Sequence, residues 1–165
     1  MRASIERLVT ALSEELKHYG EMLALLERQQ ELIVARATND MLNYVTQIQA
    51  QGRNIELARA HREDCRGALA VEENRPQDAA FADLIPVLPQ PYRPLLQALV
   101  EENNALLTRV RQRANQNHLM LSRSLELMQS FVNSLFQARE SVVYNEQGTR
   151  QSRRDCARPV YEGMG

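Results

Sequence analysis

The chain has 165 residues, 44% of them hydrophobic, with no Trp, six Gly and a formal net charge of −1. Large catalytic domains need many tight turns and usually many glycines, yet no glycine lies between Gly67 and Gly148. A net charge near zero provides no overall basic field that would attract nucleic acid or an anionic membrane. The composition instead favours a helical protein, rich in Leu, Ala, Glu, Gln and Arg.

The first predicted helix runs from about residue 4 to about residue 37. Its apolar residues recur at alternating steps of four and three, which is the pattern of a helix that packs against a partner helix: Ile5, Val9, Leu12, Leu16, Tyr19, Leu23, Leu26 and Ile33. Glu6, Glu14, Glu15 and Lys17 interrupt the apolar residues, so we expect neither a secretory signal nor stable membrane insertion here.

The second predicted helix spans about residues 39–75 and follows a break at Ala37–Asp40. Thr38 or Asn39 can cap its start, and Asp40 suits the positive end of a helix. Because the break is short, we expect the first two helices to be antiparallel neighbours. Pro76 disfavours helix at the preceding residue and so marks the end.

A connector, residues 76–94, contains one short helix and then four prolines, Pro86, Pro89, Pro91 and Pro94. Pro91 or Pro94 can occupy the first turn of the third long helix, which we predict at about residues 93–139. The remaining residues, 140–165, show no helical period and are expected to form a flexible tail. The predicted fold is all-α: an elongated antiparallel bundle or coiled coil of three long helices with a short connector helix, forming one helical domain at 1–139.

Asn103 and Asn117 lie near the apolar face of the third helix, and two interpretations are open. They can sit at the boundary and reach water, which we favour, or they can be buried amides that fix the register of paired helices at a cost in stability.

The second half of the third helix is apolar over an arc of roughly 180°, whereas one packing face typically needs about 100°. This arc contains Met120, Leu121, Leu125, Leu127, Met128, Phe131, Val132, Leu135 and Phe136. Either it packs against both other helices, or it is a surface for an amphipathic helix of a partner, to which methionines adapt readily.

Catalytic and ligand-binding motifs are not found. The three histidines lie on different helical segments, none has a second histidine at i+3 or i+4, and no nucleophile elbow or glycine-rich phosphate loop occurs. Cys65 and Cys156 are 91 residues apart, and we expect reduced thiols in a cytoplasmic protein. We therefore predict no catalytic residues, no metal and no cofactor. The basic clusters Arg109–Arg113 and Arg150–Arg154 lack the length and aromatic residues of a nucleic-acid site, so no nucleic acid is expected as a partner.

Four segments, in this order, resemble the FlgN-like flagellar export chaperones. They are "EELKHYGEMLALLERQQELI", "NIELARAHRED", "NQNHLMLSRSLELMQSFVNSLF" and "VYNEQG", and the similarity extends over nearly all of residues 5–148. The order of the helical segments, followed by Tyr-x-x-x-Gly at Tyr144 and Gly148, carries the resemblance. A second Tyr-x-x-x-Gly, from Tyr161 to Gly165, departs from the family pattern.

The resemblance implies a non-enzymatic chaperone in the cytoplasm. Such a chaperone binds the C-terminal helical segments of unassembled hook-associated proteins of the hook–filament junction, prevents their premature assembly and delivers them to the export gate. It implies that Tyr144 and Gly148 dock on the cytoplasmic domain of the flagellar export-gate membrane protein. The residues that would bind the substrate protein are Leu121, Leu125, Met128, Phe131, Val132, Leu135 and Phe136. The alternative is a structural coiled-coil scaffold, in which the apolar face of the third helix is an oligomer interface.

Overall fold

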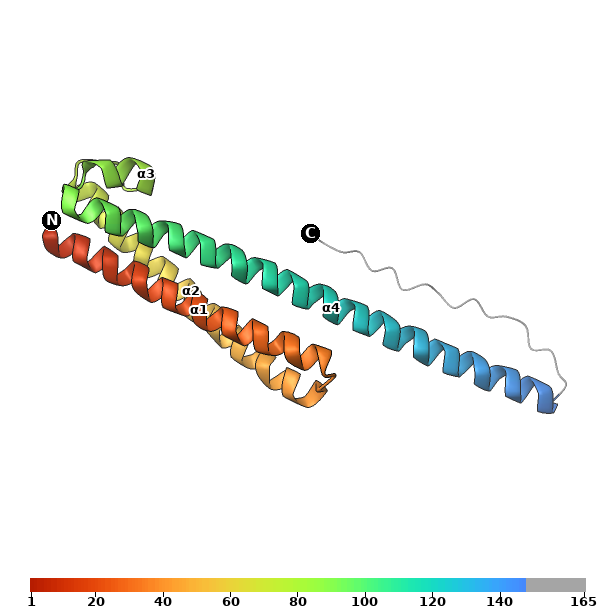
Figure 1. The fold of residues 1–165 in the computed structure, drawn as a ribbon. Coiled ribbons are helices and arrows are strands. Elements are labelled where there is room, and N and C mark those ends of the chain that lie inside the picture. Colours follow the sequence, from red (N-terminus) through yellow and green to blue (C-terminus); the bar gives the residue numbers. More distant parts are fainter. Residues whose placement is uncertain (148–165) are drawn as a thin grey trace. The chain divides into compact units, whose positions relative to one another are not determined.

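The computed structural model describes residues 1–147, apart from the side chains of Thr38 and of residues 138–147. Its elements, in chain order, are α1 (Arg2–Val34), α2 (Thr38–Glu72), α3 (Phe81–Leu84), the 3-10 turns η1 (Ile85–Val87) and η2 (Gln90–Tyr92), and α4 (Arg93–Gln147) (Figure 1). No strand occurs in this part of the chain. The prediction of an all-α bundle with three long helices and a short connector helix is confirmed.

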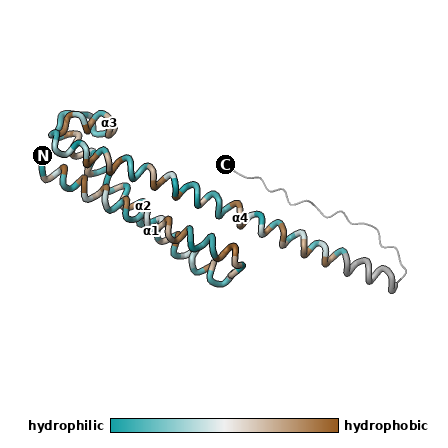
Figure 2. The backbone as a smooth tube through the Cα atoms, viewed as in Figure 1, coloured by the Kyte–Doolittle hydropathy of each residue, from teal (hydrophilic) through white to brown (hydrophobic). Residues whose placement is uncertain are grey.

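The helices α1 and α2 pack against each other as an antiparallel pair. Ser4, near the start of α1, donates a hydrogen bond to Glu72 at the end of α2, over 2.6 Å. Farther along α1, Glu15 accepts a hydrogen bond from Arg62, which lies earlier in α2. One face of α1 is apolar, and apolar and polar residues alternate along its length in Figure 2.

Both helices of this pair end without a glycine. Arg36 and Asn74, each one residue beyond the C-cap, have φ of 56°. The amide of Ala37 donates to the carbonyl of Leu32 and that of Arg36 to Ile33, and the same two hydrogen bonds recur after α2. This is the Schellman arrangement, in which a left-handed residue reverses the chain and satisfies the last carbonyls of the helix.

These two endings correct the predicted boundaries. The first helix ends at Val34 rather than near residue 37, and the second ends at Glu72 rather than near residue 75. The prediction that Thr38 or Asn39 caps the second helix is wrong, because the N-cap is Ala37 and both residues lie inside α2. Asp40 does lie in the first turn, as predicted. The helix α2 ends before Pro76 is reached, because the chain already reverses at Asn74.

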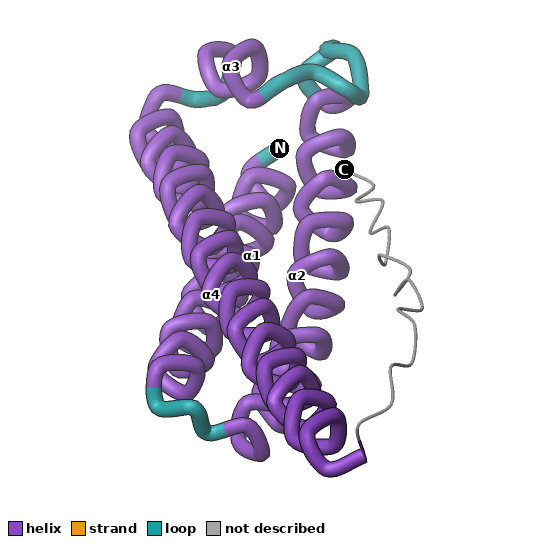
Figure 3. Tube along the Cα trace, turned by 90° about the vertical axis from the view of Figure 1, so that its right-hand side faces the viewer, coloured by secondary structure: helices purple, strands orange, loops and turns teal. Residues whose placement is uncertain are grey.

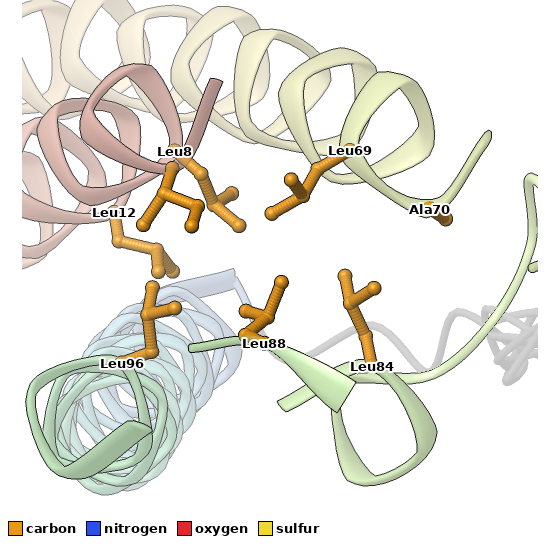
Figure 4. Close-up of a cluster of buried hydrophobic side chains, with 8 residues drawn as sticks. Leu8, Leu12, Leu69, Ala70, Leu84, Leu88 and Leu96 are labelled. Carbon is orange, nitrogen blue, oxygen red and sulfur yellow. The ribbon is translucent and has the colours of Figure 1, made fainter. Parts of the chain in front are cut away.

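The main core lies where the connector meets three helices. Side chains from α1, α2, the connector and α4 converge in Figure 4: Ile5, Leu8, Leu12, Leu69, Ala70, Leu84, Leu88 and Leu96. Each is at most 1% exposed, so this cluster removes most of its apolar surface from water. The short helix α3 places Leu84 in the core, and Leu88 follows η1. Figure 3 shows that this connector and the α1–α2 loop lie at opposite ends of α2.

The first part of α4 runs parallel to α1. Asn103 donates to the carbonyl of Leu12 and Asn117 to that of Leu26. In both pairs the residue numbers differ by 91 and increase together, so one register holds over two heptads. A second cluster between these contacts contains Tyr19 and Val110, which obey the same offset.

The helix α4 continues to Gln147, eight residues past the predicted end at 139. The prediction of a non-helical tail is therefore wrong for residues 140–147. This stretch contains neither glycine nor proline, so nothing in its backbone chemistry stops helix propagation before Gly148. The rest of the predicted tail, 148–165, lies outside the described residues.

The chain divides into two compact units, Met1–Ser122 and Arg123–Gly165. The first contains α1, α2, the connector, both apolar clusters and the start of α4. In the second, the described part is the continuation of α4. None of the described helices has the length and apolar character required to cross a membrane.

Candidate partner-binding site

An unpartnered apolar face lies on the described part of the second unit. All residues from 123 to 137 are exposed, although this stretch contains seven large apolar side chains. Six of them belong to the predicted binding residues, and we call these six the apolar strip: Leu125, Met128, Phe131, Val132, Leu135 and Phe136. Leu121, the seventh predicted binding residue, belongs to the first unit and is half-buried.

The apolar side chains of this strip are largely exposed on the second unit. Leu125 is 61% exposed and Phe131 is 65% exposed. Of the two interpretations of the wide apolar arc, the surface for a partner helix stays a prediction.

The strip has the spacing of a surface that packs against a helix. Leu125, Met128, Val132 and Leu135 follow one another at steps of three, four and three, and so share one side of α4. They span about 15 Å at a rise of about 1.5 Å per residue. The stretch 123–137 carries only two ionisable side chains, Arg123 and Glu126, both exposed. This surface can bind an apolar partner, but it brings together no groups for acid–base or nucleophilic chemistry.

A polar network in the first unit was not predicted from the sequence. Glu15 is buried, and it accepts hydrogen bonds from Tyr19 over 2.8 Å and from Arg62 over 2.8 Å. The guanidinium of Arg62 also lies 5.9 Å from the ring centre of Phe81 in α3. The network lies beside a small cavity of about 140 Å³. A sequence signal existed, because Glu15 lies three residues after Leu12 and four before Tyr19, on the apolar side of α1.

The surroundings of Tyr19 raise the pKa of its phenol. Burial, together with the hydrogen bond to Glu15 and its negative charge, raises the pKa of Tyr19 to about 12. The phenol therefore stays neutral and donates to Glu15 at neutral pH. This network ties α1, α2 and α3 together and has a structural role.

The two asparagines of α4 are buried, contrary to the interpretation that the sequence favoured. Asn103 is 6% exposed and Asn117 is 2% exposed. Each donates its side-chain amide to a carbonyl of α1, over 3.1 Å and 2.7 Å. They do not sit at a boundary with water, because α4 approaches α1 closely enough for direct amide–carbonyl bonds.

The predicted gate-docking element falls mainly outside the described residues. The backbone of Tyr144 is part of α4, but its side chain is not among the described parts of the chain. Gly148 and the second Tyr-x-x-x-Gly sequence, from Tyr161 to Gly165, also lie outside the described residues.

Comparisons with known proteins identify the chain's family. A model of the FlgN protein family matches residues 1–152, which is most of the chain. No curated protein and no solved structure matches it. The match covers the helices of the first unit and the whole of the apolar strip. The chain therefore belongs to the FlgN family, a family of chaperones for flagellar protein export.

Proposed function

We propose that this protein is a cytoplasmic chaperone of type III flagellar export that binds unassembled hook-associated proteins and delivers them to the export gate. The observation that carries the proposal is the exposed apolar strip on α4, together with membership in the FlgN family. No catalytic step is required, because the function consists of binding and release.

The proposed partner segment is an amphipathic helix at the C-terminal end of a hook-associated protein. Apolar patches of this kind on soluble proteins mark interaction sites, since water contact is unfavourable for them. A helix with apolar residues at steps of three and four would cover the strip and leave both backbones fully hydrogen-bonded. Covering the partner's own apolar face would prevent its premature assembly. The two exposed charges at the start of the stretch, Arg123 and Glu126, would stay at the rim of the interface.

Aspartate substitutions in the strip test this proposal, and α4 offers a matched control. Leu125 is 61% exposed, and Ser130, which is also exposed, lies at least about 100° around the helix from every residue of the strip at about 100° per residue. We expect Leu125→Asp and Val132→Asp to weaken binding to a hook-associated protein at least about tenfold, since each places a charge in an apolar interface. Ser130→Asp, the control, should leave the affinity within about threefold of wild type. Binding is measured by calorimetry with the purified C-terminal segment.

Circular dichroism and analytical ultracentrifugation of the same variants separate the chaperone from the alternative, a coiled-coil scaffold. The proposal expects helix content and oligomeric state to be unchanged by Leu125→Asp. If that substitution dissociates an oligomer while the affinity for the partner is unaffected, the strip is a self-association interface and the chaperone proposal is wrong.

We also propose that Tyr144 and Gly148 form the element that docks on the cytoplasmic domain of the export-gate membrane protein. The support is their position in the family's Tyr-x-x-x-Gly spacing, directly after the apolar strip. Tyr144→Ala should retain partner binding and lose binding to the gate domain in a pull-down. Tyr161→Ala is the matched comparison for the second spacing. Equal losses of partner and gate binding in Tyr144→Ala would contradict this division of roles.

A further inference from the structure

The two buried asparagines of α4 occupy equivalent positions, two heptads apart. Asn103 lies opposite Leu12 and Asn117 opposite Leu26, both at an offset of 91. In each case a polar residue follows three positions later on α1, namely Glu15 and Gln29, and both are buried. The side-chain oxygen of each asparagine is buried and accepts no hydrogen bond from the described residues. Both residues therefore carry a desolvation cost that leucine would not.

The two asparagines differ in what they bind. Asn103 donates only to backbone carbonyls, those of Leu12 and Leu99. Asn117 donates to the carbonyl of Leu26 and also to the side-chain oxygen of Gln29, over 3.1 Å. Glu15, the counterpart of Gln29, is engaged instead by Tyr19 and Arg62.

This difference matters for the register of α4 on α1. Backbone carbonyls recur at every turn of a helix, so a bond to a carbonyl can form equally well after a shift of one heptad. A side-chain acceptor occurs at one position only. The contact between Asn117 and Gln29 can therefore discriminate between registers, whereas the contacts of Asn103 cannot.

The competing register is an offset of 84, one heptad away. It places Leu96 opposite Leu12 and Val110 opposite Leu26, so the apolar seam of the two helices is filled in both registers. In that register Asn117 lies opposite Ile33, and the position three residues later falls on Arg36, which lies beyond the end of α1 at Val34. Arginine has only donors and cannot accept from the amide of Asn117. The amide of Asn117 would then lose its side-chain acceptor, and leaving a buried donor without an acceptor is destabilising.

A second polar contact supports the observed offset. Arg113 donates to the side-chain oxygen of Gln30, and its guanidinium lies 3.8 Å from Glu27. At an offset of 84, the residues seven positions farther along the chain are Val34, the last residue of α1, and Ala37, the N-cap of α2, whose side chains cannot accept from an arginine.

We propose that the Asn117–Gln29 pair selects the axial register of α4 on α1, and that Asn103 does not. The inference is independent of the proposed function. A polar pair in an apolar seam is a known means of fixing the register of paired helices at a cost in stability.

Distance measurements between spin labels on α1 and α4 test whether the Asn117–Gln29 pair selects the register. Labels are attached at Thr10→Cys and Thr108→Cys, two exposed positions on α1 and α4, in a full-length chain whose Cys65 and Cys156 are changed to serine. A shift of one heptad moves one label by about 10 Å along the helix, which pulsed electron resonance resolves. Asn117→Leu and Gln29→Leu are the test variants, and Asn103→Leu is the matched control.

The expected result is one distance in the parent chain and in Asn103→Leu, and a second distance in both Asn117→Leu and Gln29→Leu. Two variants on different helices guard against a folding defect in either one. A single distance in all four proteins would overturn the proposal. So would a second distance in Asn103→Leu, because backbone-only contacts would then be setting the register.

Discussion

At the scale of single residues, the most consequential group is the carboxylate of Glu15. It is 2% exposed and is held by Arg62 and Tyr19, with Phe81 beneath the guanidinium. Taking a carboxylate and a guanidinium out of water is costly, and the cost is recovered only when both stay paired. The network therefore ties α1, α2 and α3 together while making the first unit sensitive to the loss of either charge.

Glu15→Leu should lower the free energy of unfolding by about 3–5 kcal/mol, because it leaves Arg62 and Tyr19 without their shared acceptor. The double variant Glu15→Leu with Arg62→Met should be less destabilised than Glu15→Leu alone, since it also removes the guanidinium that Glu15→Leu leaves with only Glu63 as a partner. Urea denaturation followed by circular dichroism measures both. Glu31→Leu removes the acid of an exposed pair on the same helix and should change stability little. Additive losses in the double variant would contradict the coupling.

The raised pKa of Tyr19 predicts that the protein loses stability at alkaline pH. Its pKa is about 12 in the folded protein and near 10 when unfolded, so the unfolded state releases the proton first. The stabilisation is complete below pH 10 and disappears as the pH rises towards 12, by on the order of 2–3 kcal/mol. Urea denaturation at a series of pH values, compared with Tyr19→Phe, isolates this contribution. Parallel pH profiles for the two proteins would show that Tyr19 does not titrate in this range.

At the scale of elements, the two glycine-free helix ends are the clearest departure from sequence expectation. Arg36 and Asn74 adopt left-handed backbone conformations that glycine adopts without steric cost. Asparagine is the better tolerated of the two, because its short polar side chain suits this region.

Arg36→Gly should therefore stabilise the protein by about 0.5–1 kcal/mol, and Asn74→Gly by less. The gain is limited by the greater freedom of glycine in the unfolded chain. Thermal and urea unfolding of the two variants provide the comparison. A loss of stability in Arg36→Gly would mean that the arginine side chain contributes more than its backbone strain costs.

Much of the fold follows from local patterns in the sequence. The steps of three and four along α1, the short break before α2 and the prolines of the connector predict three long helices and their antiparallel start. The helix ends are shifted by up to three residues in the first two helices, because Schellman endings at Arg36 and Asn74 carry no glycine signal. The burial of Asn103 and Asn117 also depends on how closely α4 approaches α1, which the spacing along α4 does not contain.

The apolar strip, too, could be predicted from the sequence only in part. Its residues are recognisable from the wide arc of apolar side chains on one helix. What covers that arc cannot be read from its spacing, and the structure leaves residues 123–137 exposed. The use of Tyr144 and Gly148 in gate docking stays a prediction.

At the scale of the whole molecule, we infer different roles for the two units, stability for the first and partner binding for the second. The first unit, Met1–Ser122, contains both apolar clusters, the buried ion pair and the asparagine contacts. The described part of the second unit contains the apolar strip and makes little contribution to a core, since residues 123–137 are exposed. With partner binding proposed for the strip, we predict that stability and partner binding can be changed separately by substitutions in different units.

Hydrogen exchange of the full-length protein, with and without the C-terminal helical segment of a hook-associated protein, tests this account most directly. Exposed helix without packing should exchange quickly in the free protein, and a bound helix should protect it. We predict that residues 123–137 become protected on binding while α1 and α2 are unchanged, and that Leu125→Asp abolishes the protection. Protection confined to residues 1–122, or the absence of any change within 123–137, would contradict the assignment of partner binding to the apolar strip.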